Sequence, residues 1–254
     1  QLPAPGKSSQ IPGQHQEMSR EALEIILSCW REEGPSEYNG KYWSIREPNY
    51  NERYYWHVKP YAPPEPRIGF AGFMPKSGSL TIAGERGYIP LSFNVAPEHV
   101  AVHWAVVADS AAKAGRQANR AAWRQIREIY VADTVEEARN AVLNGFAADF
   151  WDNYFQVIVE RLDIADLFRR HGAPLDLPVN TQFLVDNGTW FVGDPYQVVA
   201  QIIEQYELSG GFGVLLQMGF DYADAGAREG WLRSMELLSK EVMPRVNAAL
   251  GQSS

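Results

Sequence analysis

Residues 74–79, with the sequence MPKSGS, carry side chains suited to holding a phosphate group. They lie between a short apolar run and a stretch with helical spacing, which predicts a loop that leads into a helix. Backbone N–H groups at a helix N-terminus attract an anion, and a small residue such as Gly78 permits close approach. Ser77 and Ser79 add hydroxyl donors, and Lys76 adds positive charge. The alternative is an ordinary helix cap with a solvated lysine, and the residues alone leave both open.

The five histidines include one pair with a spacing that suits a metal. His99 and His103 lie four residues apart on a predicted helix, so both face the same side. No glutamate stands between them in the H-E-x-x-H arrangement and no third ligand is evident, so we predict no metal site. Spacings typical of a Ser-His-Asp or Cys-His nucleophile, a G-x-G-x-x-G loop or a Walker loop do not occur. Hydrolase and nucleoside-triphosphatase functions therefore have no support.

Composition narrows the remaining functions. The 254 residues are 45% hydrophobic and carry a formal charge of −8, which is enough for a sizeable core and argues against sequence-independent nucleic-acid binding. No apolar run approaches the roughly 20 residues of a membrane helix, and the polar, Pro/Gly-rich N-terminus is unlike a signal peptide. The only cysteine, Cys29, rules out an internal disulfide. We therefore expect a cytoplasmic protein.

Strand and helix patterns alternate along the chain. An amphipathic helix is predicted over 17–33, with Ser19 as a candidate cap and Gly34-Pro35 as its end. Thr134 and Glu137 have the spacing of a capping box. The remaining predicted strands are 67–72, 88–95, 126–132 and 212–218, and the remaining predicted helices are 79–87, 97–114, 135–161, 194–208 and 228–249.

Two long excursions interrupt this alternation. Residues 36–66 are aromatic and turn-rich, and Asn39-Gly40 predicts a short hairpin there. Residues 163–187 are irregular, with one short helix around 164–170. The aromatic side chains of the first excursion suit either a subunit contact or a lid on the protein itself.

Alternating strands and helices imply a parallel sheet covered by helices. A complete eight-unit barrel takes roughly 250 residues, yet only four strands are predicted here. The fold is therefore either a small open α/β sheet or the second half of a (β/α)8 barrel. Because the chain lacks an initiator Met and begins like the middle of a loop, we expect that it starts inside a longer polypeptide or was processed.

The motifs and their order resemble the C-terminal part of the bacterial-luciferase-like, flavin-dependent monooxygenases, in particular the branch that includes limonene-type enzymes. The similarity extends over nearly the whole chain from about Glu17. The matching segments are EALEII (21–26) with Trp30, YNGKYW (38–43), AGFMPKSG (71–78), AGERG (83–87), VADTVEEA (131–138), FVGDP (191–195) and GGFG (210–213).

This resemblance implies a luciferase-like TIM barrel, of which the four predicted strands are strands five to eight. Residues 1–254 would then be a single domain, with 36–66 and 163–187 as insertions. The first four strands, which carry much of the flavin ring pocket and the usual catalytic residues of the family, are absent from this sequence, so no catalytic residue is assigned. The loop after strand five holds the flavin phosphate in the family, which implies FMN contacts by Ser77 and Gly78, with Lys76 and Ser79 as additional candidates.

Barrel active sites lie at the carboxyl ends of the strands. This rule selects Phe93, Asn94, Tyr130, Gln217 and Met218 as candidate substrate-binding residues, with core packing as the alternative for the apolar ones. Near relatives often carry His at the ends of strands seven and eight. This chain has Tyr130 and Phe220 at those places, so a polar catalytic role does not carry over.

The resemblance predicts an enzyme in which reduced FMN, supplied by a separate flavin reductase, and O2 oxidise a small hydrophobic molecule. The chain would contribute the phosphate loop and part of the pocket wall. A deazaflavin-dependent oxidoreductase on the same fold is a near alternative. A second class is a flavin-free binding or structural subunit that pairs with another chain. Because a half barrel exposes sheet edges and an apolar inner face, we expect a homo-oligomer or a partner chain that supplies the N-terminal half.

Overall fold

The computed structural model describes residues 13–30, 37–46, 60–61, 66–219 and 224–251. The chain divides into two compact units, Gln1–Ile68 and Gly69–Ser254. The predicted helix end at Gly34-Pro35, most of the aromatic excursion after Arg46, and Phe220 lie outside the described residues. In the part that is described, no helix has the length and apolar character needed to cross a membrane.

The described residues of the first unit form one helix and one hairpin. Helix α1 (Gln14–Trp30) buries Leu23, Ile25 and Leu27, and it begins five residues before Ser19, which therefore does not cap it. Strands β1 (Glu37–Asn39) and β2 (Ser44–Arg46) pair antiparallel around the predicted Asn39-Gly40 turn.

Two carboxylates of α1, those of Glu17 and Glu21, join the hairpin to the helix. Glu21 Oε1 accepts the backbone N–H groups of Tyr42 and Trp43 at 3.1 and 2.9 Å. The indole of Trp43 donates in turn to the carbonyl of Met18 at 3.1 Å. The YNGKYW motif is therefore a turn tied to α1.

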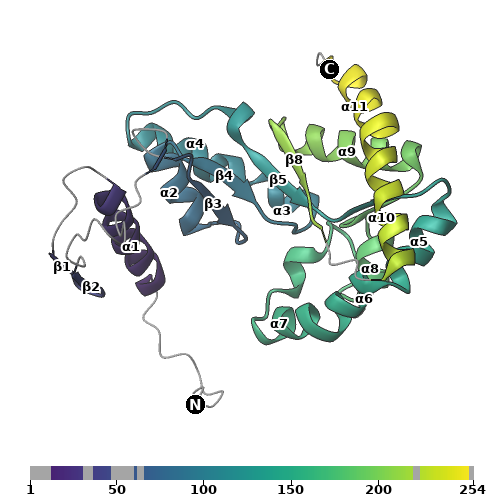
Figure 1. The fold of residues 1–254 in the computed structure, drawn as a ribbon, viewed down its shortest axis with the longest axis horizontal. Helices are drawn as coiled ribbons and strands as arrows, with labels where there is room; N and C mark the ends of the chain where they lie inside the picture. The colour runs from purple at the N-terminus through teal and green to yellow at the C-terminus, as the bar shows by residue number, and fades with distance from the viewer. Residues whose placement is uncertain (1–12, 31–36, 47–59, 62–65, 220–223, 252–254) are drawn as a thin grey trace, which may run out of the picture. The chain divides into compact units, whose positions relative to one another are not determined.

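The second unit is built on a four-stranded parallel sheet in the order β3-β4-β5-β8 (Figure 1). The bounds of the four strands are Gly69–Gly72 for β3, Ile89–Ser92 for β4, Arg124–Arg127 for β5 and Val214–Gln217 for β8. Three of the strands, β3, β4 and β8, fall inside segments predicted to be strands, whereas β5 begins two residues before the predicted strand 126–132 and shares only residues 126 and 127 with it. The α/β class and the parallel sheet predicted from the alternation are therefore confirmed.

The third predicted strand is divided by one residue. Glu128 separates β5 from β6 (Ile129–Val131), and β6 pairs parallel with β7 (Phe191–Gly193) instead of with the main sheet. The sequence analysis missed β7, because three buried residues directly before a helix cap give too short a run to recognise.

Short helices fill the connections between strands. Helices α2 (Gly78–Arg86) and α4 (His103–Lys113) pack side by side, and α3 (Pro97–Ala101) precedes α4. The predicted helix over 97–114 is thus interrupted at Val102. The capping box of Thr134 and Glu137 opens α5 (Val135–Leu143), as predicted. Asp194 caps α9 (Pro195–Ser209), and Gly210 ends it at φ 66°.

The single long helix predicted over 135–161 was wrong. Gly145 adopts an extended backbone, and a Cβ there would lie 2.2 Å from the carbonyl oxygen of Ala141. The chain therefore breaks into α5, α6 (Phe146–Phe150), a π-helical turn (Trp151–Phe155) and α7 (Gln156–Arg161). The irregular segment that follows holds the predicted short helix, as a 3₁₀ turn at Ala165–Phe168, and also α8 (Thr181–Asp186), which was not predicted.

The closing helix also contains a π-helical turn. It consists of α10 (Ala225–Leu237), the turn Leu238–Val242 and α11 (Met243–Ala249). Pro244 lacks the N–H that would continue the α-helical ladder, which accounts for the irregular turn directly before it.

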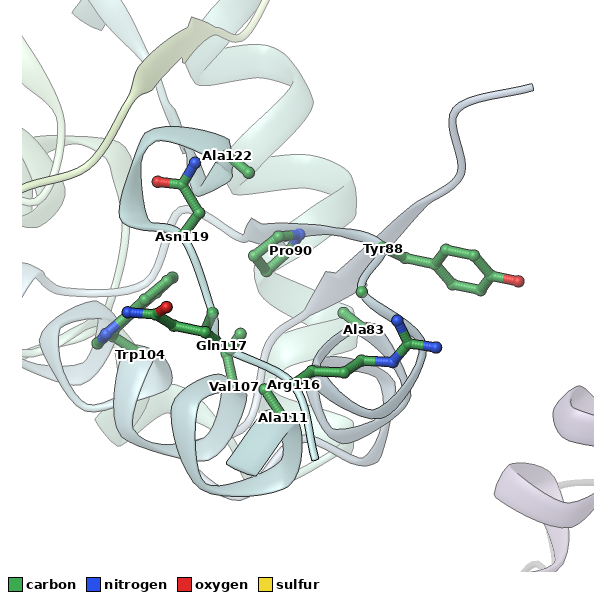
Figure 2. A pocket seen from close by; sticks show the side chains of 13 residues that line it. Ala83, Tyr88, Pro90, Trp104, Val107, Ala111, Arg116, Gln117, Asn119 and Ala122 are labelled. Carbon is green, nitrogen blue, oxygen red and sulfur yellow. The ribbon is translucent and has the colours of Figure 1, made fainter. Parts of the chain in front are cut away.

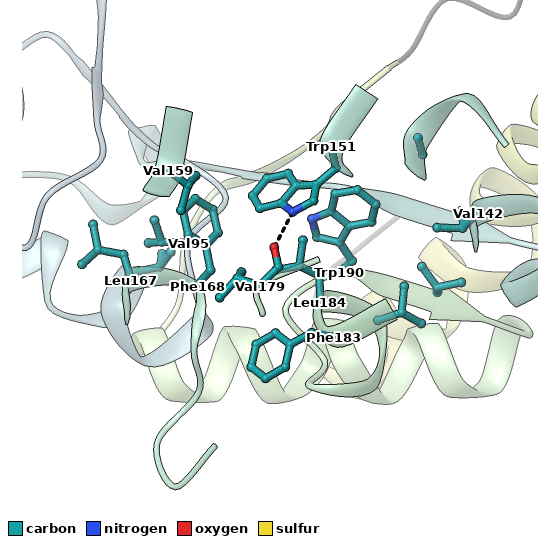
Figure 3. Close-up of a cluster of buried hydrophobic side chains, with 14 of the residues drawn as sticks. Val95, Val142, Trp151, Val159, Leu167, Phe168, Val179, Phe183, Leu184 and Trp190 are labelled. Atoms are coloured by element: carbon teal, nitrogen blue, oxygen red, sulfur yellow. Dashed lines mark hydrogen bonds between the residues drawn. The ribbon is translucent and has the colours of Figure 1, made fainter. Parts of the chain in front are cut away.

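The largest core cluster centres on aromatic rings (Figure 3). Trp151 contacts Trp190 and Phe168 edge-on, with ring centroids 5.6 and 5.0 Å apart. Its indole N–H donates to the carbonyl of Val179 at 2.7 Å. The irregular segment 163–187 is thereby held against the π-helical turn that presents Trp151.

Candidate functional site

The loop after β3 closes tightly on the start of α2. Ser77 is the N-cap, and its hydroxyl accepts the N–H of Leu80 at 3.3 Å. A Cβ on Gly72 would lie 2.8 Å from this hydroxyl and 2.3 Å from Leu80, so the end of the strand needs a glycine for the loop to pack. The structure therefore contains the ordinary helix cap that was the alternative to a phosphate site in this loop.

The cap does not use all the donors of the loop. The Ser77 carbonyl accepts the N–H of Thr81 at 3.0 Å, and its hydroxyl takes that of Leu80. The first N–H groups of a helix have no partner within the helix, so those of Gly78 and Ser79 remain available in a half-buried position. The Lys76 side chain is exposed next to them. The arrangement fits an anion such as the phosphate of a cofactor.

A second feature at the same edge of the sheet is a cavity of about 370 Å³. It lies at the carboxyl ends of β4, β5 and β8 and is closed on another side by α6 and the π-helical turn. Six of its lining residues are large and apolar, and only two are polar. The lining residues are Phe93, Asn94, Glu128, Phe146, Phe150, Trp151, Phe155, Met218 and Gly219.

Aromatic contacts link the cavity to the loop. The ring centroids of Phe93 and Phe73 lie 6.0 Å apart, and Phe73 directly follows β3 at the start of the loop. The backbone N–H of Phe93 donates to the carbonyl of Gly72 at 2.9 Å. Phe73 contacts Phe168 at 5.5 Å in the core. The candidate phosphate loop and the apolar cavity are therefore neighbours at one end of the sheet.

The structure brings together three of the five predicted substrate-binding residues. Phe93, Asn94 and Met218 line the cavity. Gln217 instead donates to the carbonyl of Ile129 at 2.9 Å. Tyr130 lies against Trp231, at a ring separation of 6.3 Å, and lines a smaller pocket that shares Glu128 with this cavity. Neither Gln217 nor Tyr130 is among the residues that line the cavity itself.

Glu128 was not predicted from the sequence, and it is the only ionisable side chain among the described residues that line the cavity. It is 6% exposed, and the Asn94 amide donates to its Oε1. Burial raises the pKa of Glu128 to about 7, and this effect outweighs the lowering by its own backbone, by Arg127 and by Asn94. The signal in the sequence is the Arg127-Glu128 pair within an otherwise apolar run, where charge is costly to bury.

A buried histidine lies near the loop. His103 Nδ1 is 3.1 Å from the hydroxyl of Ser92, which also accepts the indole N–H of Trp123 at 2.8 Å. Burial lowers the pKa of His103 to about 4, so it is neutral at physiological pH. His99 contacts His171 edge-on at 6.0 Å. Among the described residues no three His, Cys, Asp or Glu side chains gather as a metal site would require.

Another cavity, of about 120 Å³, lies at the opposite end of the sheet (Figure 2). Tyr88 and Pro90 at the start of β4 line it, together with Arg116 and Asn119 from the connection between α4 and β5. In barrel enzymes the amino ends of the strands serve stability and the carboxyl ends carry the active site. The cavity beside Glu128 is therefore the stronger candidate.

Comparison with known proteins confirms the resemblance inferred from the motifs. A family model described as luciferase-like monooxygenase matches residues 11–211. The chain is 31% identical over 237 residues to 3,6-diketocamphane 1,6-monooxygenase of Pseudomonas putida, and it covers 62% of that protein. It is 30% identical over 199 residues to limonene 1,2-monooxygenase of Rhodococcus erythropolis, of which it covers 48%. The chain thus spans about half to two thirds of these relatives.

A solved structure extends the similarity to the fold. It is the oxygenating constituent of 3,6-diketocamphane monooxygenase from Pseudomonas putida, a type II Baeyer-Villiger monooxygenase in complex with FMN. The match has a TM-score of 0.76 at 31% identity and covers 92% of this chain and 65% of that one.

Proposed function

The chain belongs to the luciferase-like monooxygenase family, and on this basis we propose that it works in a flavin-dependent monooxygenase that uses reduced FMN and O2 to oxidise a small hydrophobic molecule. The observation that carries the proposal is the placement of an anion-binding loop beside an apolar cavity, in a chain similar over 92% of its length to an FMN-bound relative. The named relatives act on diketocamphanes and limonene. These are small, largely apolar molecules, and the mainly aromatic lining of the cavity suits such a substrate.

The residues of the loop fit a flavin phosphate. The N–H groups of Gly78 and Ser79, the hydroxyl of Ser77 and the charge of Lys76 would hold it. When bound, reduced FMN would supply the electrons that activate O2. The chain's own part is to hold the phosphate, exclude water from the cavity with its aromatic side chains, and orient the substrate. We keep Phe93, Asn94, Tyr130, Gln217 and Met218 as proposed substrate-binding residues, the three that line the cavity being favoured.

We further propose that β3, β4, β5 with β6, and β8 are strands five to eight of a (β/α)8 barrel, and that residues 1–254 act as one domain with insertions at 36–66 and 163–187. The parallel order β3-β4-β5-β8 supports this assignment. So does the exposure of Gly69, Ala71 and Val214 on the sheet, since a closed barrel would cover its inner face. The partners would be a flavin reductase and either a second copy or a chain with the N-terminal half. The lone Cys29, which forms no disulfide, suits a cytoplasmic location.

FMN binding to the purified protein tests the proposal directly. The double variant Ser77→Asp, Gly78→Glu adds two negative charges at the proposed phosphate site, and aspartate still serves as an N-cap. We expect saturable quenching of flavin fluorescence by the wild type and at least tenfold weaker binding by the variant. Lys113→Glu is the matched control, because it changes the net charge by the same amount on the exposed side of α4.

Two outcomes would contradict the proposal. Absence of saturable FMN binding would favour the flavin-free subunit, and equal loss of binding in Lys113→Glu would remove the loop as the site. Native mass spectrometry of the protein from its own source tests the barrel assignment. A longer chain or a complex with a second polypeptide that retains FMN is expected, whereas a flavin-free species with the mass of this chain alone would overturn it.

A further inference from the structure

Glu128 and Asn94 are the two polar side chains in an otherwise apolar cavity. They come from neighbouring strands of the sheet, Asn94 just after β4 and Glu128 just after β5. Both are nearly inaccessible, at 3% and 6% exposed. Aromatic rings of Phe93, Phe150 and Trp151 surround them.

The pair leaves hydrogen-bonding capacity unused. The Asn94 amide donates to Glu128 Oε1, but Glu128 Oε2 and Asn94 Oδ1 have no partner in the part of the chain that the structure describes. Buried polar atoms are nearly always paired, because an unpaired one costs about 1–3 kcal/mol. Two adjacent unpaired atoms in the lining of a cavity therefore indicate that something else completes them.

The neighbouring positive charge is directed elsewhere. The Arg127 guanidinium donates to the carbonyl of Val95 and to Gln205 Oε1, on the side of the strand that faces α9. Among the described residues that line the cavity there is no cation, and burial raises the pKa of the Glu128 carboxyl group to about 7. The protonated form has an O–H at Oε2 that can donate, as well as an oxygen that accepts from Asn94.

We propose that Glu128, held in place by Asn94, is the specificity-determining residue of this cavity and selects an apolar ligand that carries one neutral oxygen, a carbonyl or a hydroxyl, to which Glu128 donates a hydrogen bond. The inference rests on the proposed function in taking this ligand as the substrate. A ligand hydroxyl would also donate to Asn94 Oδ1, which completes both unpaired atoms. A plain hydrocarbon leaves both atoms unpaired. A carboxylate ligand would be repelled by Glu128 whenever Glu128 is ionised, because the ionised group has no O–H to donate.

The alternative is a merely structural pair that packs the end of the sheet. If Glu128 selects the ligand, its substitution changes which ligand is preferred, whereas substitution of a structural residue changes only stability. Glu128→Gln keeps the shape, the acceptor for Asn94 and a donor in place of the O–H. Glu128→Leu removes both while leaving an apolar surface of similar size.

The test measures the affinity of two probe ligands with the same ten-carbon skeleton, the ketone 2-decalone and the hydrocarbon decalin. Equilibrium headspace partitioning over the purified protein reports the free concentration of each at pH 6, and thus both dissociation constants. Infrared spectroscopy of the bound ketone reports its C=O stretch, which moves to lower frequency when the oxygen accepts a hydrogen bond. Gln201→Leu is the matched control, because it also replaces a polar side chain that has an unpaired buried oxygen with leucine, but on α9 and outside the lining of this cavity.

We expect the wild type, Glu128→Gln and Gln201→Leu to prefer the ketone over the hydrocarbon by roughly tenfold. Glu128→Leu should lose this preference and the shift of the C=O stretch, yet bind decalin as well as the wild type does. Equal affinity of the wild type for both probes, or a preference that survives in Glu128→Leu, would overturn the inference. The measurement needs neither flavin nor turnover. Failure to bind FMN would therefore overturn the proposed function but would leave the measured ketone preference of Glu128 valid.

Discussion

Arg127 and Glu128 are adjacent in the chain, but the polar groups around them are satisfied to different degrees. On the side of β5 that faces α9, the Arg127 guanidinium donates to Gln205 at 2.7 Å, Gln205 donates to Gln125 at 2.7 Å, and Gln125 donates to Ser209 at 2.9 Å. Only Arg127 Nε remains without a partner in this group. On the other side, Glu128 has one partner, Asn94, and an unpaired Oε2.

This difference separates two uses of buried polarity. The side chains facing α9 complete one another, so they hold the helix against the sheet and leave nothing for a ligand. The side chains facing the cavity are incomplete, which costs stability and provides a place for a ligand to bind. A single strand therefore carries a structural network on one face and a candidate binding group on the other.

The largest effect is expected from breaking the structural network. Gln205→Leu removes the acceptor of a fully buried guanidinium and the donor to Gln125, so we expect the free energy of unfolding to fall by about 4 kcal/mol. Chemical denaturation measures this. Gln201→Leu on the same helix is the matched control, because the Gln201 amide oxygen is already unpaired. Similar losses in both variants would show that the hydrogen bonds of Gln205 contribute no more to stability than any buried amide on this helix.

The next effect concerns the pH dependence of stability on the cavity side. Folding raises the pKa of Glu128 from 4.5 to about 7, so the folded state holds this proton more tightly than the unfolded state. The resulting stabilisation is fully present below pH 4.5 and is lost as the pH rises through 7. We expect the wild type to lose about 3 kcal/mol relative to Glu128→Gln between pH 4.5 and 8.

Denaturation of both proteins across this pH range measures the difference. Subtracting the variant removes contributions from other groups, such as His103. Its pKa, lowered to about 4, makes both proteins less stable as the pH falls from 6.5 towards 4. A constant difference between the two proteins across the range would mean that Glu128 titrates as an exposed carboxylate does.

A smaller effect is expected at the phosphate loop, where one side chain is proposed to serve both structure and ligand. Ser77→Ala removes the cap of α2, and we expect a loss of about 1 kcal/mol in unfolding free energy together with weaker FMN binding. Ser77→Asp should keep the stability and still weaken FMN binding through repulsion. If both variants bind FMN as the wild type does, the loop is only a helix cap.

The smallest effect is expected at Tyr130. Its ring lies against Trp231 and outside the larger cavity, so Tyr130→Phe should change the unfolding free energy by less than about 0.5 kcal/mol. Because phenylalanine keeps the ring and lacks only the hydroxyl, we expect the affinity for ligands in the cavity beside Glu128 to fall less than it does in Glu128→Leu. A clear loss of affinity in this variant would extend the binding site along β6. The binding groups would then no longer be confined to the side chains that face the cavity beside Glu128.

Local patterns were sufficient for much of the fold. The apolar period located the body of α1 and the strands β3, β4 and β8, and turn or cap residues located the hairpin and the starts of α5 and α9, because each of these depends on neighbours within a few residues. They failed where distant contacts decide. Gly145 lies inside the single helix predicted over 135–161, yet the chain breaks there between α5 and α6, and β7 is a strand only because β6 pairs with it.

The candidate site divides in the same way. The loop 74–79 could be recognised from its residue types, and the rule that strand ends carry the site selected Phe93, Asn94 and Met218, which line the cavity. The same rule selected Tyr130 and Gln217, whose side chains turn elsewhere. One residue more or less along a strand reverses the face, and the interruption at Glu128 between β5 and β6 changes that count.

For this protein, residue types and their spacing determine the α/β class, the family and the loop with free N–H groups, since these follow from patterns within a few residues and from motifs kept in order. Only the tertiary structure brings Asn94 to Glu128 across 34 residues of sequence and turns Arg127 away from both. Burial then sets the charge of the carboxyl group, because the free energy of an ionised group depends on the solvent and partners that the fold leaves around it.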